Sequence, residues 1–437
     1  MKLCIDNFAK ISHADIVIDG ITVIAGENNT GKSTIGKILF SLFNSISDIE
    51  EKILYQRRYE IEQSCRSALF NYMQVNGTED RKAPRASLYR SAMTVARAIS
   101  QRFLELHQEH ISIEYTEIVK NIQEILGASE ISLQQSGFEE ITEQMANLVN
   151  EIITLPEQTI ELEILSRYFR GVFHGQINSL VSVGTEAELK LAIKDKEIAL
   201  IFENDECQKC TADIALLHKA IYIDNPFVVD KLSGYEDLND SDELLKSLMT
   251  QEQDNIMDGV IETVLVRGKL AEVYQALQTV VNGKIVLKPD GEFYLEEEGF
   301  SEPISLMNLS TGLKSFVVLK MLIEKGAIKE KDVLILDEPE IHLHPQWQMT
   351  YAELIVLLQK YFDLSIIVTT HSPYFLDAIN LFSAKHGIDK KVNYYLSSME
   401  GNRVVMDLVT DNIDSIYKKM ASPIQMLETM RYELNNQ

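Results

Sequence analysis

The sequence predicts an α/β fold with a mixed, largely parallel core sheet, antiparallel strands at the N-terminus and a helical insertion. The apolar runs ITVIA (21–25), VLIL (333–336) and SIIV (365–368) are typical of strands that a parallel sheet buries on both faces. The first 25 residues divide into two or three short strands around the turn signal Asp19-Gly20. Residues 44–168 are rich in Glu, Gln, Ile and Leu and have almost no proline, which favours helices.

Local patterns predict the other elements. A helix is expected over 32–43, and the alternating residues 188–203 predict a hairpin that turns at 194–196. Residues 284–297 predict a second hairpin around Pro289-Asp290-Gly291. Further expectations are a strand at 220–223, helix over 235–280, strands at 393–396 and 403–408, and a final helix.

Composition indicates a soluble globular protein of 437 residues, 45% hydrophobic and 24% charged. The sequence has no apolar run of about 18 residues, so no membrane span is expected. The N-terminus lacks the apolar core of a secretory signal. Four scattered cysteines are too few for a disulfide framework, which favours a cytoplasmic location.

The net charge of −25, from 41 basic and 66 acidic side chains, opposes nucleic-acid binding by the bulk of the surface. One stretch, 81–102, is basic throughout, and Arg90 and Arg97 share a helical face in it. Two interpretations stay open: a basic face that is solvated or pairs with acidic helices, and a contact surface for nucleic acid or an acidic partner.

A phosphate-binding loop is the most specific motif. Gly26-x4-Gly31-Lys32-Ser33 lies between a predicted strand and a predicted helix, as this loop requires. Its backbone N–H groups and the helix N-terminus bind phosphate, Lys32 reaches the β- and γ-phosphates, and Ser33 ligates Mg²⁺. The candidate nucleotide-binding residues of the loop are Gly26, Glu27, Asn28, Asn29, Thr30, Gly31, Lys32, Ser33 and Thr34.

Acidic side chains follow the second apolar run. The strand 333–336 delivers Asp337 and Glu338 to its carboxyl edge, where ligands bind in open α/β sheets. Asp337 is the candidate residue that holds Mg²⁺ through water, and Glu338 is the candidate base that polarises the attacking water. Taken without the upstream loop, the same pattern also fits ordinary surface acids.

Two further motifs complete the set. His371 follows the strand ending at Thr370, where it is placed to sense or polarise a γ-phosphate, although a lone histidine here is more often structural. In NLSTGLKS (308–315), Ser310 is a plausible N-cap and Gly312 permits close backbone approach. The alternatives for this segment are a second anion-binding helix N-terminus and an ordinary capped helix.

The pair Cys207 and Cys210 is a weak signal. Two such pairs from two subunits would complete a four-cysteine zinc site, and His218 lies nearby in sequence. A redox role and uncoordinated thiols are the alternatives, and uncoordinated thiols are favoured.

Together these motifs resemble the ATP-binding-cassette superfamily: a phosphate loop, residues 309–312 (LSTG), VLILDEPE and a switch-like His371. The resemblance implies an ATPase head that uses ATP and Mg²⁺. Two subunits would pair head to tail, so that Ser310 and Gly312 of one close on the γ-phosphate held by the other, with help from Lys314.

Other site residues follow from the same resemblance. Segment 340–345 would occupy the family's D-loop, with His342 and His344 near the dimer seam, although it departs from the common Ser-Ala-Leu-Asp form. A metal site at the two histidines is the alternative. Gln176 is the candidate for the Q-loop glutamine, and the Phe8 region would approach the adenine.

The spacing of the motifs resembles one branch of the superfamily. The interval from Gly31 to Ser310 is 310 − 31 = 279 residues, as in the SMC, RecF and OLD-nuclease branch. Only 437 − 371 = 66 residues follow His371, too few for a Toprim nuclease domain. The chain therefore resembles the stand-alone AAA-family ATPases of prokaryotic antiviral systems, such as the Septu ATPase, which act with a separate nuclease or toxin.

The resemblance also gives expected domains. ATPase lobe I covers 1–45 and 169–234, the helical insertion 46–168, a helical segment with a hairpin 235–300, and lobe II 301–437. The leading hypothesis is an ATPase that forms a homodimer or larger assembly on ATP and gates an effector in antiviral defence. The alternatives are a DNA-repair ATPase of the SMC/RecF type that binds DNA directly, and a clamp that holds ATP without hydrolysis.

Overall fold

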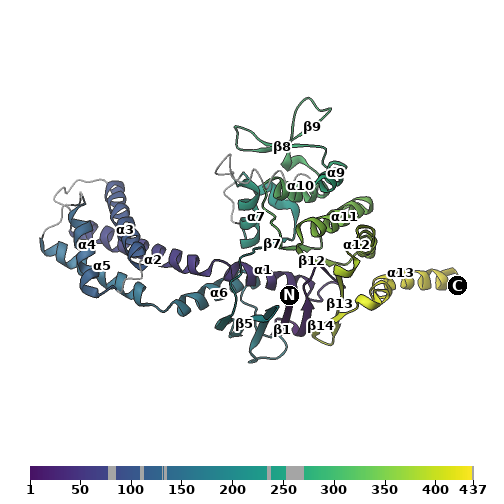
Figure 1. Cartoon of the computed structure of the whole chain (residues 1–437), viewed down its shortest axis with the longest axis horizontal. Helices are drawn as coiled ribbons and strands as arrows, with labels where there is room; N and C mark the ends of the chain where they lie inside the picture. The colour runs from purple at the N-terminus through teal and green to yellow at the C-terminus, as the bar shows by residue number, and fades with distance from the viewer. Residues whose placement is uncertain are drawn as a thin grey trace. The chain divides into compact units, whose positions relative to one another are not determined.

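The structure is a computed structural model that describes residues 1–76, 85–108, 113–129, 131, 135–233, 238–251 and 270–435. The chain divides into two compact units, one of residues 1–47 and 165–437 and one of residues 48–164 (Figure 1). The finer division of the first unit into two lobes stays a prediction. No helix in the described ranges is long and apolar enough to cross a membrane.

Eleven of the described strands form one sheet in the first unit, in the order β6-β5-β4-β1-β2-β14-β13-β3-β12-β11-β7, and β10-β9-β8 form a small separate sheet. The strands are β1 (Lys2–Phe8), β2 (Ile11–Val17), β3 (Ile21–Gly26), β4 (Ala187–Ile193), β5 (Lys196–Glu203), β6 (Glu206–Ala212), β7 (Ala220–Ile223), β8 (Gly283–Leu287), β9 (Phe293–Glu297), β10 (Ile304–Ser305), β11 (Val333–Asp337), β12 (Ser365–Thr370), β13 (Val392–Glu400) and β14 (Arg403–Leu408).

Helices connect many of these strands along the chain. Those of the first unit are α1 (Lys32–Ile46), α7 (Asp240–Thr250), α9 (Ala271–Gln278), α10 (Thr311–Glu324), α11 (Pro345–Phe362), α12 (Pro373–His386) and α13 (Asp414–Asn435). The helical insertion contains α2 (Ile49–Asn76), α3 (Arg85–Gln108), α4 (Tyr115–Gly127) and α5 (Gln135–Thr154), and α6 (Glu157–Phe173) returns the chain to the first unit.

One end of the large sheet, from β13 to the edge strand β7, is parallel, and its strands are mostly buried on both faces. β13, β3, β12, β11 and β7 run in the same direction. Because side chains alternate along a strand, Leu334 and Leu336 enter the core that α10, α11 and α12 share, whereas Ile335 points to α1. A Cβ at Gly36 of α1 would lie 2.7 Å from Cγ2 of Ile335. The glycine therefore lets α1 pack directly on the sheet.

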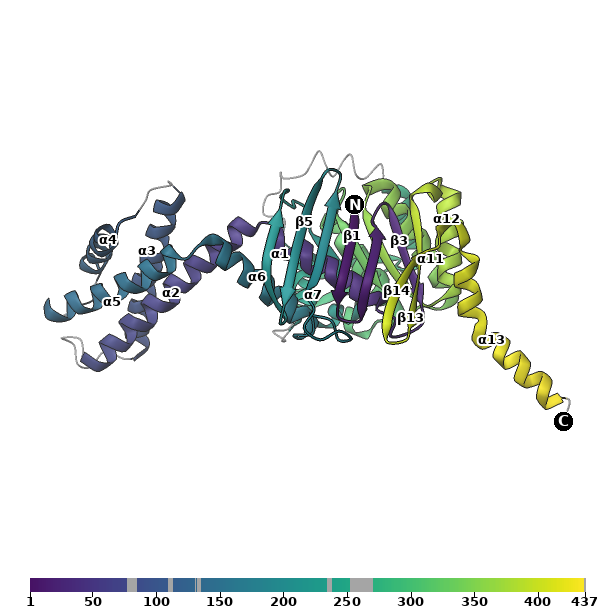
Figure 2. The same cartoon turned by 90° about the horizontal axis from the view of Figure 1, so that it is seen from below.

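The N-terminal half of the sheet is mostly antiparallel, and only one of its faces is covered. Along β1, Leu3 and Ile5 are fully buried, whereas Cys4 and Asp6 on the opposite face are partly exposed. Phe8 ends the strand in an aromatic cluster with Phe169, Phe173 and Phe202. Figure 2 labels β5, β1, β14 and β13 in this sheet, in which β4 lies between β5 and β1, and β2 lies between β1 and β14.

The predicted fold class is confirmed, as are both hairpins and the strands at 220–223 and 403–408. The first helix runs to Ile46, three residues beyond its predicted end at 43. Strand β6, which contains Cys207 and Cys210, was missed by the sequence analysis. The predicted helix over 235–280 is described only at its ends, by α7 and α9, because residues 252–269 lie outside the described residues.

The helical unit has an apolar core of its own. All four helices contribute buried side chains to one hydrophobic cluster, including Leu69 of α2, Ile99 of α3, Ile122 of α4 and Ile141 of α5. The basic stretch 81–102 falls mainly on α3, although residues 81–84 lie outside the described residues. Its Arg90 and Arg97 are exposed, so both interpretations of this stretch stay open.

Candidate nucleotide-binding site

The phosphate-loop motif forms the turn between β3 and α1. Asn29 and Gly31 have positive φ angles of 64° and 76°, so the chain reverses tightly before the helix begins. Gly26 must also be a glycine, because a Cβ there would lie 2.3 Å from the carbonyl oxygen of Ser397 on β13. The buried Thr30 donates a hydrogen bond to the carbonyl of Glu27. This backbone leaves the N-terminus of α1 open to an anion, as the motif predicts.

Lys32 is held inside this loop. Its amine donates to the carbonyl oxygens of Gly26 (3.1 Å) and Glu27 (2.8 Å) and lies 3.2 Å from Oε1 of Glu338. The Lys32 side chain is only 3% exposed. The structure therefore brings the candidate phosphate-binding lysine and the candidate base into one ion pair.

Asp337 joins three hydroxyl groups at the end of β11. Its Oδ1 accepts a hydrogen bond from Ser33 (2.9 Å) and one from Thr369 of β12, and its Oδ2 accepts one from Tyr222 of β7 (2.6 Å). Adjacent ligands of an octahedral Mg²⁺, with bonds of about 2.0–2.1 Å, are about 2.9 Å apart. The oxygens of Ser33 and Asp337 thus have the spacing that Mg²⁺ needs.

Tyr222 and Asp224 are two polar groups of this edge that sequence reasoning missed. Burial raises the pKa of Tyr222 well above its ordinary value, and the charge of Asp337 adds to the shift, so the phenol remains a donor. Burial also raises the pKa of Asp224, with the negative charges of Asp242 and Asp337 as further causes. For Asp224 the signal was present in the sequence: an apolar run, 220–223, is followed at once by this acidic residue.

Glu338 and His371 face each other across the ends of β11 and β12. Glu338 has a positive φ of 48°, and its N–H donates to the carbonyl (3.1 Å) and hydroxyl (3.0 Å) oxygens of Thr369. Oε2 of Glu338 lies 3.6 Å from Nδ1 of His371. The two predicted catalytic residues therefore share one site with Lys32, although their roles stay predictions.

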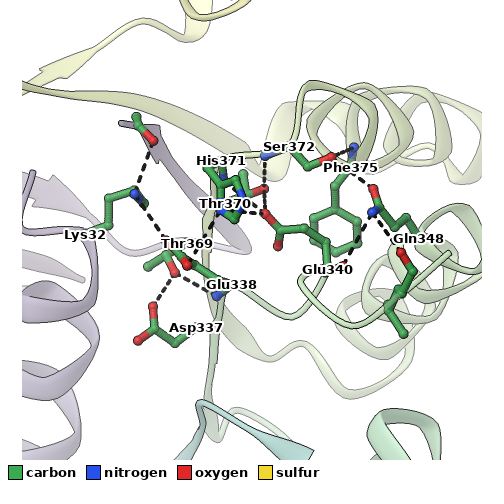
Figure 3. Close-up of polar contacts among 12 residues, drawn as sticks. Lys32, Asp337, Glu338, Glu340, Gln348, Thr369, Thr370, His371, Ser372 and Phe375 are labelled. Carbon is green, nitrogen blue, oxygen red and sulfur yellow. Dashed lines mark hydrogen bonds and ion pairs between the residues drawn. The ribbon is translucent and has the colours of Figure 1, made fainter. Parts of the chain in front are cut away.

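Glu340 anchors the turn that carries His371 (Figure 3). Its Oε1 accepts hydrogen bonds from the Thr370 hydroxyl (2.5 Å) and the N–H of His371 (3.0 Å) and lies 3.7 Å from Nδ1 of His371. Glu340 is 2% exposed, and its Oε2 has no hydrogen-bond partner among the described residues. Burial raises the pKa of Glu340, and the hydrogen bonds from Thr370 and His371 offset part of this shift. No local sequence pattern singles out this carboxyl.

A pocket of about 340 Å³ extends from the phosphate loop. Lys10, Phe173, His174 and Gln176 line it together with residues 29–34 and Glu338. Gln176 thus lies beside the loop, but its assignment as the Q-loop glutamine stays a prediction. Phe8 is fully buried in its aromatic cluster, and the next two residues of the chain line the pocket instead.

The predicted signature segment lies at a second pocket, of about 570 Å³, lined by Ser310, Thr311, Gly312, His342, His344 and Trp347. Ser310 is the N-cap of α10 and accepts a hydrogen bond from the N–H of Leu313. A Cβ at Gly312 would lie 2.8 Å from the His342 carbonyl oxygen, so this glycine allows the close approach predicted for it. Lys314 is buried in an ion pair with Asp230 (2.5 Å).

The cysteine pair lies on an edge strand. Cys207 is buried and its N–H donates to the Ser166 hydroxyl, whereas Cys210 is partly exposed. His218 pairs instead with Asp332 (3.2 Å). His344 caps α11 through a hydrogen bond to its Nδ1, so this histidine has a structural partner within the chain.

Comparison with known families agrees with this geometry. A family model described as an AAA ATPase domain matches residues 1–376, most of the chain. The chain belongs to the AAA ATPase domain family. The family implies ATP and Mg²⁺, for which Lys32, Ser33 and Asp337 provide the groups described above.

Two curated relatives of this AAA ATPase chain match over shorter stretches. The Septu protein PtuA of Bacillus thuringiensis is 33% identical over 130 residues, which are 26% of this chain and 29% of that protein. The Retron Ec83 probable ATPase of Escherichia coli is 25% identical over 242 residues, 47% of this chain and 40% of that protein. The match thus spans less than half the length of either relative. The predicted resemblance to a Septu ATPase is confirmed over that shared stretch.

Solved structures similar to this chain include the SMC head domain from Thermotoga maritima, with 12% identity and a TM-score of 0.39 over 93% of this chain and 98% of that one. An SmcHead bound to the C-winged helix domain of ScpA has 14% identity and a TM-score of 0.41, covering 94% of this chain and 98% of that one.

The buried carboxyl of Glu340 predicts a pH-dependent stability difference. Its raised folded-state pKa means that the folded chain keeps this proton after the unfolded chain, whose pKa is near 4.5, has lost it. The Glu340 contribution to the free energy of unfolding therefore falls as pH rises from about 4.5 through the folded-state pKa. Glu340→Gln does not titrate, so its stability relative to wild type should increase with pH over that window.

Denaturant unfolding at a series of pH values measures this difference. The exposed Glu330, which lies just before β11, provides the matched control, and Glu330→Gln should show no such trend. A stability difference for Glu340→Gln that is flat, or that decreases with pH, would contradict the buried-carboxyl assignment.

Proposed function

We propose that this chain is an ATPase that closes as a head-to-tail homodimer on ATP and gates a separate effector, a nuclease or toxin, in antiviral defence. The observation that carries the proposal is the separation of two half-sites. The phosphate-loop pocket and the signature pocket have no described lining residue in common. A chain whose anion-binding helix N-termini line different pockets needs a second copy to bring them to one nucleotide.

The residues of the first half-site support hydrolysis. Ser33 and Asp337 would hold Mg²⁺, and the amine of Lys32 would bind the terminal phosphates. Binding phosphate would compete with Glu338 for that amine. Glu338 would then be free to accept a proton from water, with His371 placed 3.6 Å away to contact the same region.

The residues of the second half-site support closure. Ser310, at the N-cap of α10, would present its hydroxyl and the first N–H groups of the helix to the partner's γ-phosphate. Because Lys314 is buried in its pair with Asp230, we assign it a structural role in holding α10, in place of the help in closure that the resemblance implies.

Replacing the proposed base should separate binding from hydrolysis. Glu338→Gln keeps a similar shape but cannot accept the proton, so we expect ATP to bind, a stable dimer or larger assembly to accumulate, and turnover to fall by about 10²-fold or more. Light scattering with and without ATP–Mg²⁺, and phosphate release, measure the two effects. Glu330→Gln serves as the matched control, and wild-type turnover in Glu338→Gln would refute the assignment.

Mixing two inactive variants tests whether the site is shared between copies. Lys32→Ala disables the phosphate loop, and Ser310→Arg obstructs the signature pocket. In a head-to-tail heterodimer both changes fall in one site and the other is intact. An equal mixture should therefore recover about a quarter of wild-type activity, since half the dimers have one working site of two. Two variants that stay inactive when mixed, although each still folds, would indicate a site contained in one chain.

The effector role rests on the relatives named above, one a Septu protein and one a retron ATPase. We expect the product of the adjacent gene to co-purify with Glu338→Gln in ATP, and its nuclease or toxin activity to change when ATP is hydrolysed. Lys32→Ala, which lacks the phosphate-binding amine, is the control bait. Equal recovery with both baits would rule out gating by ATP, and direct salt-dependent DNA binding by the chain alone would favour the DNA-repair alternative.

A further inference from the structure

Three side chains that can bind a metal lie together on the exposed face of the β1–β2 hairpin. The buried side chains of both strands lie on the other face. Cys4 and Asp6 are two residues apart on β1 and so point to the same face. His13 of β2 lies directly across from Asp6 in the strand register. Their sulfur, oxygen and nitrogen atoms all lie within 4.8 Å of one another. Within the described ranges, this is the one group of three such side chains with that spacing.

The Cys4–Asp6 distance in this group fits a tetrahedral ion. Sγ of Cys4 lies 3.6 Å from Oδ2 of Asp6. Zinc bonds of about 2.3 Å to sulfur and about 2.0 Å to oxygen place two tetrahedral ligands about 3.5 Å apart. Nδ1 of His13 lies 2.7 Å from Oδ1 of Asp6, a hydrogen-bond distance, so the imidazole must rotate away from that oxygen to share an ion with the carboxylate. The His13 side chain is 59% exposed and has room to rotate.

The backbone beneath the group is fixed. Leu3 and Ile5 alternate with Cys4 and Asp6 and are fully buried, and β1 is paired on both edges, by β2 and by β4. A one-residue slip of the register would expose those apolar side chains, so the positions of the three ligands are well determined. The ligands themselves remain open to solvent on the uncovered face of the sheet.

The neighbouring lysines already have carboxylate partners. Lys2 pairs with Asp15 (2.9 Å), the residue across from Cys4 on β2. Lys190, across from Cys4 on β4, pairs with Glu188 (2.7 Å). Because each of these amines has a carboxylate partner other than Asp6, the charge of Asp6 can neutralise a bound cation.

We propose that Cys4, Asp6 and His13 form a zinc-binding site with one coordination position left to water. A thiolate, an imidazole and a carboxylate suit Zn²⁺, whereas Mg²⁺ and Ca²⁺ select sites made of oxygens. The Cys4 thiol releases its proton to solvent when the metal binds. The ion cross-links β1 and β2, whose connecting turn bears Lys10, and the Lys10 amine donates to the side chain of Asn29 in the phosphate loop (2.8 Å).

Cobalt titration of the full-length, tag-free chain tests the site. The protein is first stripped with a chelator and kept free of nucleotide, and Co²⁺ then serves as the spectroscopic substitute for Zn²⁺. We expect one equivalent of Co²⁺ to bind with thiolate-to-metal charge-transfer absorption, and Zn²⁺ to displace it. Cys4→Ser should abolish that absorption. Loss of an outer-shell partner alone typically weakens metal affinity by at least about 10-fold, so loss of the His13 ligand in His13→Ala should weaken Co²⁺ binding by more than about 10-fold.

Matched controls come from the same chain. Cys210→Ser changes another partly exposed strand cysteine, and His218→Ala changes another histidine paired with a carboxylate. Both should retain the absorption, and Zn²⁺ should raise the thermal midpoint of wild type but not of Cys4→Ser. Wild-type protein without the thiolate absorption, absorption that survives Cys4→Ser, or its loss in Cys210→Ser would each overturn the proposal.

Discussion

The parallel pairing of β3, β12 and β11 is the constraint on which the rest of the nucleotide-binding edge depends. In this register Thr369 lies beside Asp337, and Thr370 lies beside Ala25 at the end of β3. Strands that run the same way end at the same edge, so the phosphate loop, the acidic pair and His371 meet there although hundreds of residues separate them. The pairing is secured by strands buried on both faces, which leaves little freedom to shift.

Three carboxyl groups follow one another at the end of β11, and their surroundings give them different chemistry. Asp337 accepts hydrogen bonds from three hydroxyls, Glu338 is paired with Lys32, and Glu340 is buried with one oxygen unpartnered among the described residues. Hydroxyl donors suit the metal-binding role proposed for Asp337 with Ser33, and an ion pair that phosphate can displace suits the proposed role of Glu338 as a base. The buried acid instead fixes the backbone of His371, so position matters more here than residue type.

Long-range contacts explain what sequence reasoning missed. Tyr222 reaches Asp337 across 115 residues, and Glu340 holds a backbone N–H 31 residues away. No local sequence pattern predicts either contact, whereas the phosphate loop is recognised from nine consecutive residues. Strand β6 was missed because its residues, ECQKCTA, lack clear apolar alternation and form a strand through pairing with β5. Here tertiary context overrode weak local propensity.

The sequence by itself determined the elements whose physics is local: the glycine-rich turn before α1, the apolar strands, the hairpin at Pro289-Asp290-Gly291 and the N-cap at Ser310. It also determined the family, since four motifs in a fixed order are hard to obtain by chance. Only the tertiary structure decided that Lys314 is already paired, that the signature and the phosphate loop line different pockets, and that Cys4, Asp6 and His13 lie together. Those facts depend on strand register and helix packing. Both bring together residues that are far apart in the sequence, and no local sequence pattern predicts such contacts.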